Sequence, residues 1–169
     1  MTPTGFSRSP VQRRTLFAGF VLGLWLALFS PPASAQLGCL VVGAPPLFGT
    51  YSTSTGAPAN GTVTVTCLVA GIFGVDVSYT VRLGMSANAQ GTQRRMKNGS
   101  AFLNYNVFCD SGYGQVWGNG LSSTCAPTGG QTGLLGTLVT IFPVYGNIPP
   151  GQYVTPGTYN DSIDIDVLY

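Results

Sequence analysis

The sequence ends with TPGTYNDSIDIDVLY, residues Thr155 to Tyr169, and this stretch decides the fold. After the turn at Pro156-Gly157, apolar and polar residues alternate strictly, which predicts a half-buried β-strand. The polar face carries Ser162, Asp164 and Asp166, and the apolar face carries Ile163, Ile165, Val167 and Tyr169. No later segment is available to pair with the far side of this strand. We therefore expect another chain to supply the missing neighbour.

The same period of two recurs in other segments, and no segment shows the period of a helix. The expected strands cover residues 62–69, 75–83, 101–109 and 135–146. Turn signals separate them, and these are Asn60-Gly61, Asn98-Gly99, Asn119-Gly120, Thr128-Gly129-Gly130 and Pro149-Pro150-Gly151. Short strands at this spacing predict an all-β sandwich. Because proline cannot donate to a strand ladder, we expect Pro143 at an edge or a bend.

The first 35 residues have the layout of a secretory signal peptide. Basic residues precede an uncharged apolar run from Leu16 to Phe29, and a small-x-small motif follows at Ala33-Ser34-Ala35. The run is short compared with the roughly 20 residues that span a bilayer, which favours cleavage over a membrane anchor. We expect cleavage after Ala35, no stable membrane span afterwards, and one domain at residues 36–169.

The charge of the chain changes sign when residues 1–35 are removed. Three of the seven basic residues lie there, which leaves four against five aspartates and a net charge of −1. No basic patch remains to indicate a nucleic-acid partner.

All four cysteines follow the expected cleavage site, at Cys39, Cys67, Cys109 and Cys125. An even number in an exported chain indicates two disulfides. Three pairings are possible, and we favour Cys39–Cys67 with Cys109–Cys125 because each joins neighbouring segments. A zinc site is the alternative, but the sequence has neither histidine nor a Cys-x-x-Cys pair.

The composition gives little support to an enzyme. Histidine and glutamate are both absent, which removes the commonest general base and every Ser–His or Cys–His nucleophile. Asp164 and Asp166 share one strand face. Paired catalytic carboxylates and calcium ligands are two interpretations of this pair, but it is more typical of the solvent-exposed face of a sheet. We expect no catalytic residue, no metal site and no cofactor.

Several segments in order resemble one family. They are FGTY (48–51), GTVTVTC (61–67), RRMKNG (94–99), LNYNVFCD (103–110), VWGNG (116–120), FPVYGNIPPGQ (142–152) and PGTYNDSIDIDVLY (156–169). Together they resemble the spore coat protein U domain family, which includes pilin subunits of archaic chaperone–usher pili. The resemblance covers nearly all of residues 36–169.

The resemblance implies an incomplete immunoglobulin-like β-sandwich that lacks its final strand. A donor strand from another chain would fill the strand-acceptor groove beside Ile163, Ile165, Val167 and Tyr169. The implied partners are a periplasmic chaperone, an outer-membrane usher and other pilin-like subunits. The implied location is the periplasm in transit and then the cell surface or the extracellular space.

One feature departs from the shaft subunits of the family, which carry a donor extension before the first cysteine. Only Gln36, Leu37 and Gly38 precede Cys39 after the expected cleavage, and three residues span about 10 Å at most. We expect a strand acceptor at a tip or terminal position of a surface fibre or coat. The alternative is a free-standing secreted module that binds carbohydrate or protein through exposed aromatics such as Tyr113 and Trp117. For Trp117 we favour the other interpretation, in which it packs beneath the loop between Cys109 and Cys125.

Overall fold

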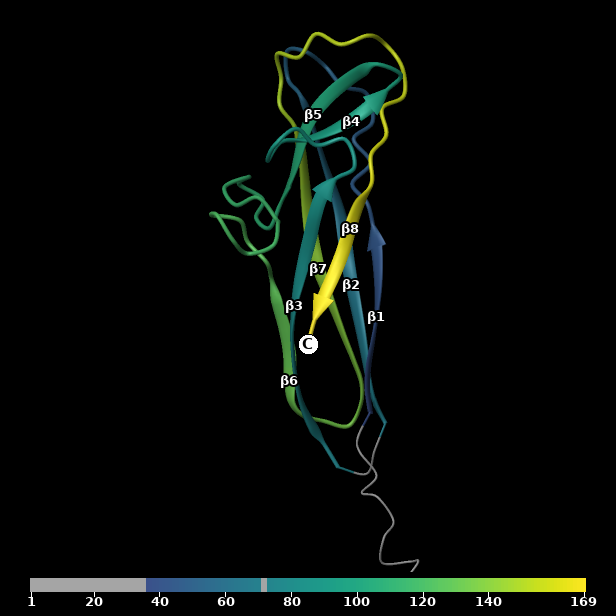
Figure 1. Cartoon of the computed structure of the whole chain (residues 1–169), viewed down its shortest axis with the longest axis vertical. Helices are drawn as coiled ribbons and strands as arrows, with labels where there is room; N and C mark the ends of the chain where they lie inside the picture. The colour runs from purple at the N-terminus through teal and green to yellow at the C-terminus, as the bar shows by residue number, and fades with distance from the viewer. Residues whose placement is uncertain (1–35, 71–72) are drawn as a thin grey trace, which may run out of the picture. The chain divides into compact units, whose positions relative to one another are not determined.

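The computed structural model describes residues 36–70 and 73–169, and Figure 1 shows that this part of the chain is built from strands alone. The strands are β1 (Gln36–Ala44), β2 (Ala57–Ala70), β3 (Val75–Ser86), β4 (Arg94–Asn98), β5 (Ala101–Phe108), β6 (Thr128–Leu134), β7 (Gly136–Ile148) and β8 (Ile163–Leu168). Within these residues no helix is long and apolar enough to cross a membrane. The expected signal peptide lies outside the described residues.

Two antiparallel sheets face each other. The larger sheet has the strand order β1-β2-β7-β5-β4, and the smaller one has the order β6-β3-β8. Residues from both inner faces form one core, including Val65 and Val107 from the larger sheet and Val81 from the smaller sheet. The fold is therefore the all-β sandwich that the alternating patterns predicted, and it is immunoglobulin-like, as the resemblance implied.

Alternation along β3 shows why this strand forms. Val77, Tyr79 and Val81 are buried, whereas Asp76 and Ser78 between them are exposed. Residues that alternate in this way point to opposite faces of a sheet, so one face of β3 enters the core and the other meets water. In β5, Leu103, Tyr105 and Val107 are buried by the same pattern, as predicted.

Two of the turn predictions are wrong. Asn60-Gly61 lies inside β2, where it pairs with Tyr145 and Val144 of β7, and Thr128-Gly129-Gly130 begins β6. Close packing accounts for both glycines. A side chain at Gly61 would collide with the backbone of Ala44, and one at Gly129 would collide with the ring of Tyr79. Each glycine therefore permits the close approach of a neighbour within a strand rather than a reversal of the chain.

Pro143 occupies a local edge within an interior strand. β7 lies between β2 and β5, but β5 pairs with it only from Tyr145 to Asn147. Pro143 pairs with Thr62 of β2 on one side, and no residue of β5 pairs with it on the other side. The missing N–H of proline is tolerated at such a position.

The two disulfides stabilise different parts of the sandwich. Cys39–Cys67 joins register partners on β1 and β2, and Cys109–Cys125 closes a loop of the chain after β5. These are the pairs favoured from the sequence. Within the second loop Trp117 is fully buried, and its indole Nε1 donates to Val81 O at 3.1 Å. Trp117 is thus part of the core, and it is not an exposed binding aromatic.

Candidate functional site

The side of β8 that faces away from β3 has no strand neighbour among the described residues. β8 pairs with β3 alone, from Ile163 opposite Ser86 to Leu168 opposite Thr80. In Figure 1, β8 stops part-way along β3, with β1 on its other side. The part of β3 from Val75 to Tyr79 extends beyond this pairing. Backbone N–H and C=O groups along such an edge are available to another strand.

The opposite wall is β1, the edge strand of the larger sheet. It pairs only with β2, and its inward residues Leu37, Cys39 and Val41 are half-buried against the core. β1 and β8 are not hydrogen-bonded to each other, although they touch where the side chain of Ile165 lies over Gly43. We call these two facing strand edges, which no backbone hydrogen bond joins, the edge groove; their inward residues are Leu37, Cys39, Val41 and Gly43 on β1 and Ile163, Ile165 and Val167 on β8.

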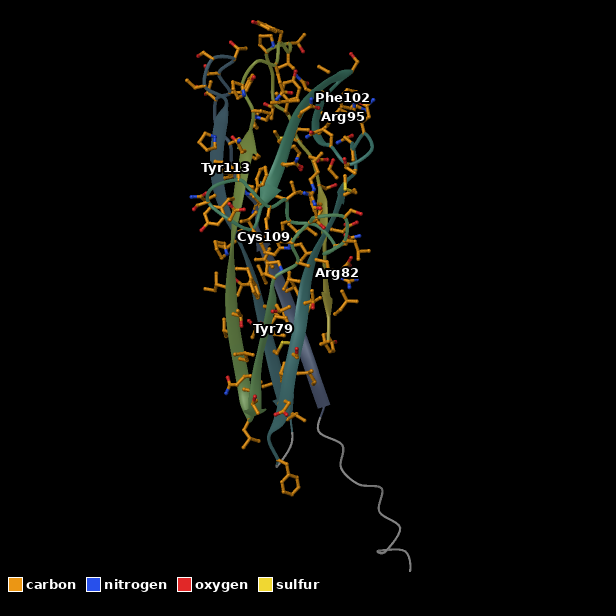
Figure 2. The ribbon with its side chains drawn as sticks, turned by 90° about the vertical axis from the view of Figure 1, so that its left-hand side faces the viewer. Tyr79, Arg82, Arg95, Phe102, Cys109 and Tyr113 are labelled. Atoms are coloured by element: carbon orange, nitrogen blue, oxygen red, sulfur yellow. A yellow bond between two sulfur atoms is a disulfide. The ribbon has the colours of Figure 1, made fainter. Side chains whose placement is uncertain are left out.

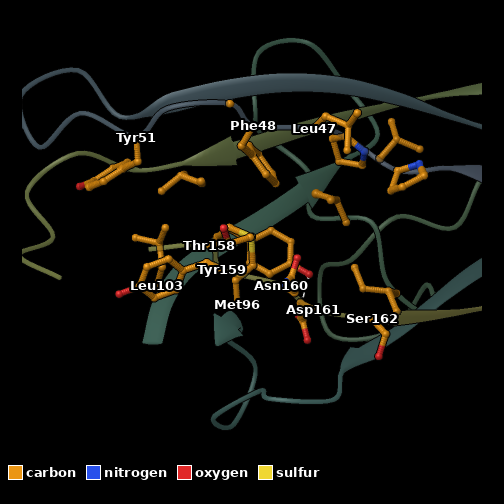
Figure 3. A pocket seen from close by; sticks show the side chains of 18 of the residues that line it. Leu47, Phe48, Tyr51, Met96, Leu103, Thr158, Tyr159, Asn160, Asp161 and Ser162 are labelled. Atoms are coloured by element: carbon orange, nitrogen blue, oxygen red, sulfur yellow. Dashed lines mark hydrogen bonds between the residues drawn. The ribbon is translucent and has the colours of Figure 1, made fainter. Parts of the chain in front are cut away.

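A cleft of about 940 Å³ continues the edge groove beyond Ile163. One rim is the segment after β1, which includes Phe48 and Tyr51, and the other is the segment before β8, which includes Tyr159 and Asp161. Figure 3 shows Phe48 and Tyr159 on opposite sides of the cleft, with Met96 and Leu103 also lining it. Met96, Leu103, Val107, Val144 and Ile148 belong to the core and also line the cleft. The core is therefore reached from outside between these two segments.

Asp161 ties the segment before β8 to the rest of the sandwich. The Tyr105 hydroxyl donates to its carboxylate at 2.7 Å, and the amide of Asn88 donates to the other oxygen at 3.0 Å. Burial and this bond to Asp161 raise the pKa of Tyr105 well above its usual range. Tyr105 therefore keeps its proton and remains a donor at any physiological pH.

Arg94 supports the same region from inside the core. It is only 1% exposed, and one Nη donates to Gly84 O at 2.7 Å and to Trp117 O at 2.8 Å. Burial lowers the pKa of Arg94, while Tyr105 and Asp161 act in the opposite direction. The guanidinium joins β4, which also carries the cleft residue Met96, to β3 and to the loop closed by Cys109–Cys125.

Of the four residues expected to line an acceptor groove, three lie on β8 and the fourth lies beyond its end. Ile163, Ile165 and Val167 are half-buried and pack against the core from β8. Tyr169 lies one residue past the end of β8 and is 66% exposed. Asp164 and Asp166 lie on the exposed face of β8. The groove wall on this side thus consists of three apolar side chains.

Three contributors to the site escaped sequence reasoning. Gly43 lies in β1, which has apolar residues on both faces and so shows no period of two. Arg94 lies in a segment that reads as a turn, yet it begins β4. Asp161 precedes the predicted strand. Arg94 lies two residues before Met96, so the alternation of a strand places both side chains on the same, buried face. This spacing was the signal by which the sequence could have indicated a buried Arg94.

The chemistry of the site is that of an apolar surface bordered by strand edges. It offers apolar side chains and strand edges, and within the described residues no group of three His, Cys, Asp or Glu side chains could hold a metal ion. Such a site can bury an extended segment by main-chain hydrogen bonds to the edge of β8 or of β1 and by apolar contacts with the core.

The chain is similar to one protein family and to a solved structure. The model of the Spore Coat Protein U domain family matches residues 26–166. A solved structure with a similar fold is the CsuC–CsuE chaperone–tip adhesion subunit pre-assembly complex from archaic chaperone-usher Csu pili of Acinetobacter baumannii. The similarity has a TM-score of 0.54 and 22% sequence identity, and it covers 79% of this chain and 40% of the matched chain. The chain thus spans two fifths of that protein's length. No curated protein matches the sequence at a significant level.

Proposed function

Because this chain belongs to the spore coat protein U domain family, we propose that it is a structural or adhesive subunit of a fibre or coat on the cell surface. In this proposal a chaperone–usher pathway assembles the subunit, and the edge groove accepts a strand from another chain. The observation that carries the proposal is the position of β8, which lies against β1 without a backbone hydrogen bond to it.

The walls of the edge groove fit a strand. An inserted strand would hydrogen-bond to β8 on one side, and its alternate side chains would point into the core. Val81 and Leu83 on the adjacent strand β3 are 0% and 5% exposed, whereas Ile163, Ile165 and Val167 on β8 are only half-buried. A donor strand would complete the burial of these three side chains.

The energy available from a donor strand is comparable with the stability of a domain. Burying four donor side chains at about 1.5–3 kcal/mol each comes to on the order of 10 kcal/mol. A domain of this size is stable by about 5–15 kcal/mol. The donor strand therefore decides how stable the subunit is, which explains a need for a chaperone before assembly.

The proposed partners follow from this mechanism. A periplasmic chaperone lends the first strand, and the neighbouring subunit supplies the strand that replaces it at an outer-membrane usher. Residues 1–35 direct export in this proposal, and the mature domain comprises residues 36–169. The subunit passes through the periplasm and ends at the cell surface or outside the cell. No step in this route requires the chain to be an enzyme.

The experiment replaces Ile165 with Asp and measures capture of the subunit by its chaperone during periplasmic co-expression. A carboxylate on the wall of an apolar groove should abolish capture because it must be desolvated there. Asp164→Asn is the matched control, since it changes the neighbouring residue on the exposed face of the same strand. Capture should survive in the control.

Two results would overturn the proposal. One is equal capture of the Ile165→Asp variant. The other is a wild-type chain that purifies alone as a monomer of high stability and whose cooperative unfolding in urea is not shifted by a donor strand. The second result would favour a free-standing secreted module.

A further inference from the structure

The outer face of β4 and β5 carries a set of side chains that the edge groove does not use. In β4 the buried residues are Arg94 and Met96, and in β5 they are Leu103, Tyr105 and Val107. The residues between them therefore point away from the core. We call this surface the β4–β5 face; it comprises Arg95, Lys97, Phe102, Asn104 and Asn106.

Two cations converge on one aromatic ring of this face. The guanidinium of Arg95 lies 4.2 Å from the centre of the Phe102 ring, and the ammonium of Lys97 lies 5.9 Å from it. Figure 2 shows Arg95 and Phe102 together near the end of the sandwich. Arg95 is held in place, because its Nε donates to Asn88 O and its Nη1 donates to Gln90 Oε1, both at 2.9 Å. The remaining N–H groups of its planar fork are available to a ligand.

No side-chain carboxylate of the chain neutralises these cations. Asp110 accepts from the amides of Gly114 and Gln115, Asp161 from Tyr105 and Asn88, and Asp76 from Gly133. Asp164 and Asp166 belong to β8 in the other sheet. The sequence contains no other acidic side chain. The β4–β5 face therefore complements an anion that comes from outside the chain.

Amide side chains continue the face along β5, beginning with Asn104, the register partner of Arg95. Asn104 and Asn106 follow Phe102 along β5 at intervals of two residues, and Asn147 of β7 lies opposite Asn106. Phe108 ends the row beside Tyr145, so the row from Phe102 to Phe108 is about 20 Å long. The side-chain amides of Asn104 and Asn147 can both donate and accept hydrogen bonds, whereas Asn106 Oδ1 is buried. Such a row suits a ligand rich in hydroxyl groups.

We propose that the β4–β5 face binds an acidic polysaccharide, with Arg95 and Lys97 holding a sugar carboxylate and the asparagines holding neighbouring hydroxyls. The combination of unpaired cations with amides favours a uronic-acid polymer over a neutral glycan or an acidic peptide. The site does not depend on strand acceptance, because β4 and β1 form opposite edges of the larger sheet.

The test measures binding of a galacturonic-acid oligosaccharide to the exported chain in complex with its chaperone by calorimetry, with a malto-oligosaccharide and poly-glutamate for comparison. Replacing Arg95 and Lys97 together with Gln should weaken binding at least tenfold, because charge-assisted hydrogen bonds are lost. Arg82→Gln is the matched control, since it removes one cation from β3 in the other sheet. The control should bind as the wild type does.

Asn104→Ala should weaken binding of the oligosaccharide and leave any residual binding of poly-glutamate unchanged. Equal binding of poly-glutamate by the wild type would show a surface for acidic protein and overturn the proposal. Absence of measurable oligosaccharide binding, or equal loss in the Arg82→Gln control, would overturn it as well.

Discussion

The side chain of Ile165 on β8 lies directly over Gly43 on β1, so that a β-carbon at position 43 would come within 2.7 Å of Ile165 Cδ1. This contact joins the two walls of the edge groove where no backbone hydrogen bond does. In the proposed mechanism a donor strand must displace it, because strands within one sheet lie about 4.8 Å apart and the new strand has to fit between the walls.

We expect Gly43→Val to push β8 away from β1 and to speed amide hydrogen exchange in β8. Ile165→Ala should remove most of this effect, because the smaller side chain leaves room for valine. A double-mutant cycle from urea unfolding should then give a coupling free energy of about 0.5–3 kcal/mol, as for residues in contact. Additive effects of the two substitutions would contradict the contact.

The two disulfides should differ in what they do for the edge groove. Replacing both Cys39 and Cys67 with serine should cost about 3–4 kcal/mol of stability and also weaken donor capture, because β1 is a wall of the groove. Replacing Cys109 and Cys125 should cost about 3 kcal/mol with capture largely retained. Unfolding curves and chaperone capture, measured on both variants, compare them directly. The reverse order of capture would show that β1 is not a wall.

Arg94→Ala should destabilise the domain by about 3 kcal/mol or more. The change leaves the carbonyls of Gly84 and Trp117 without their donor and opens a cavity in the core. Lys97→Ala is the control, because Lys97 is exposed on the same strand and should cost less than about 1 kcal/mol. Urea unfolding midpoints measure both. Similar losses in the two variants would show that the buried guanidinium has no special role.

The loop after β5 should loosen in acid. Hydrogen bonds from the amides of Gly114 and Gln115 lower the pKa of Asp110 below its usual value near 4. A carboxyl whose folded pKa is depressed stabilises the fold above its unfolded pKa, and this contribution is lost as pH falls through the folded pKa. The protection of the Gly114 and Gln115 amides, measured as the exchange rate relative to the intrinsic rate at the same pH, should therefore fall below about pH 4. In Asp110→Asn the exchange should show no such transition, and a transition that persists there would assign it to another group.

Local pattern was enough to predict much of this protein. The alternation of Ile163, Ile165 and Val167 with aspartates identified β8, and the same period identified the buried faces of β3 and β5. The ordered motifs indicated the family and an immunoglobulin-like sandwich. These features lie within single strands, where the pleat alone determines which side chains share a face.

Only the tertiary structure decided which strands face each other. β1 was not predicted, because Leu40 and Val42 are 65% and 57% exposed and give its outer face the same apolar character as its inner face. Three features depend on residues far apart in the sequence. They are the position of β1 opposite β8, the contact of Ile165 with Gly43 and the burial of Arg94. A period of two specifies which face of a strand is buried, but it carries no information about what that face will meet. Non-local pairing supplies that information, and it exists only once the sheets have assembled.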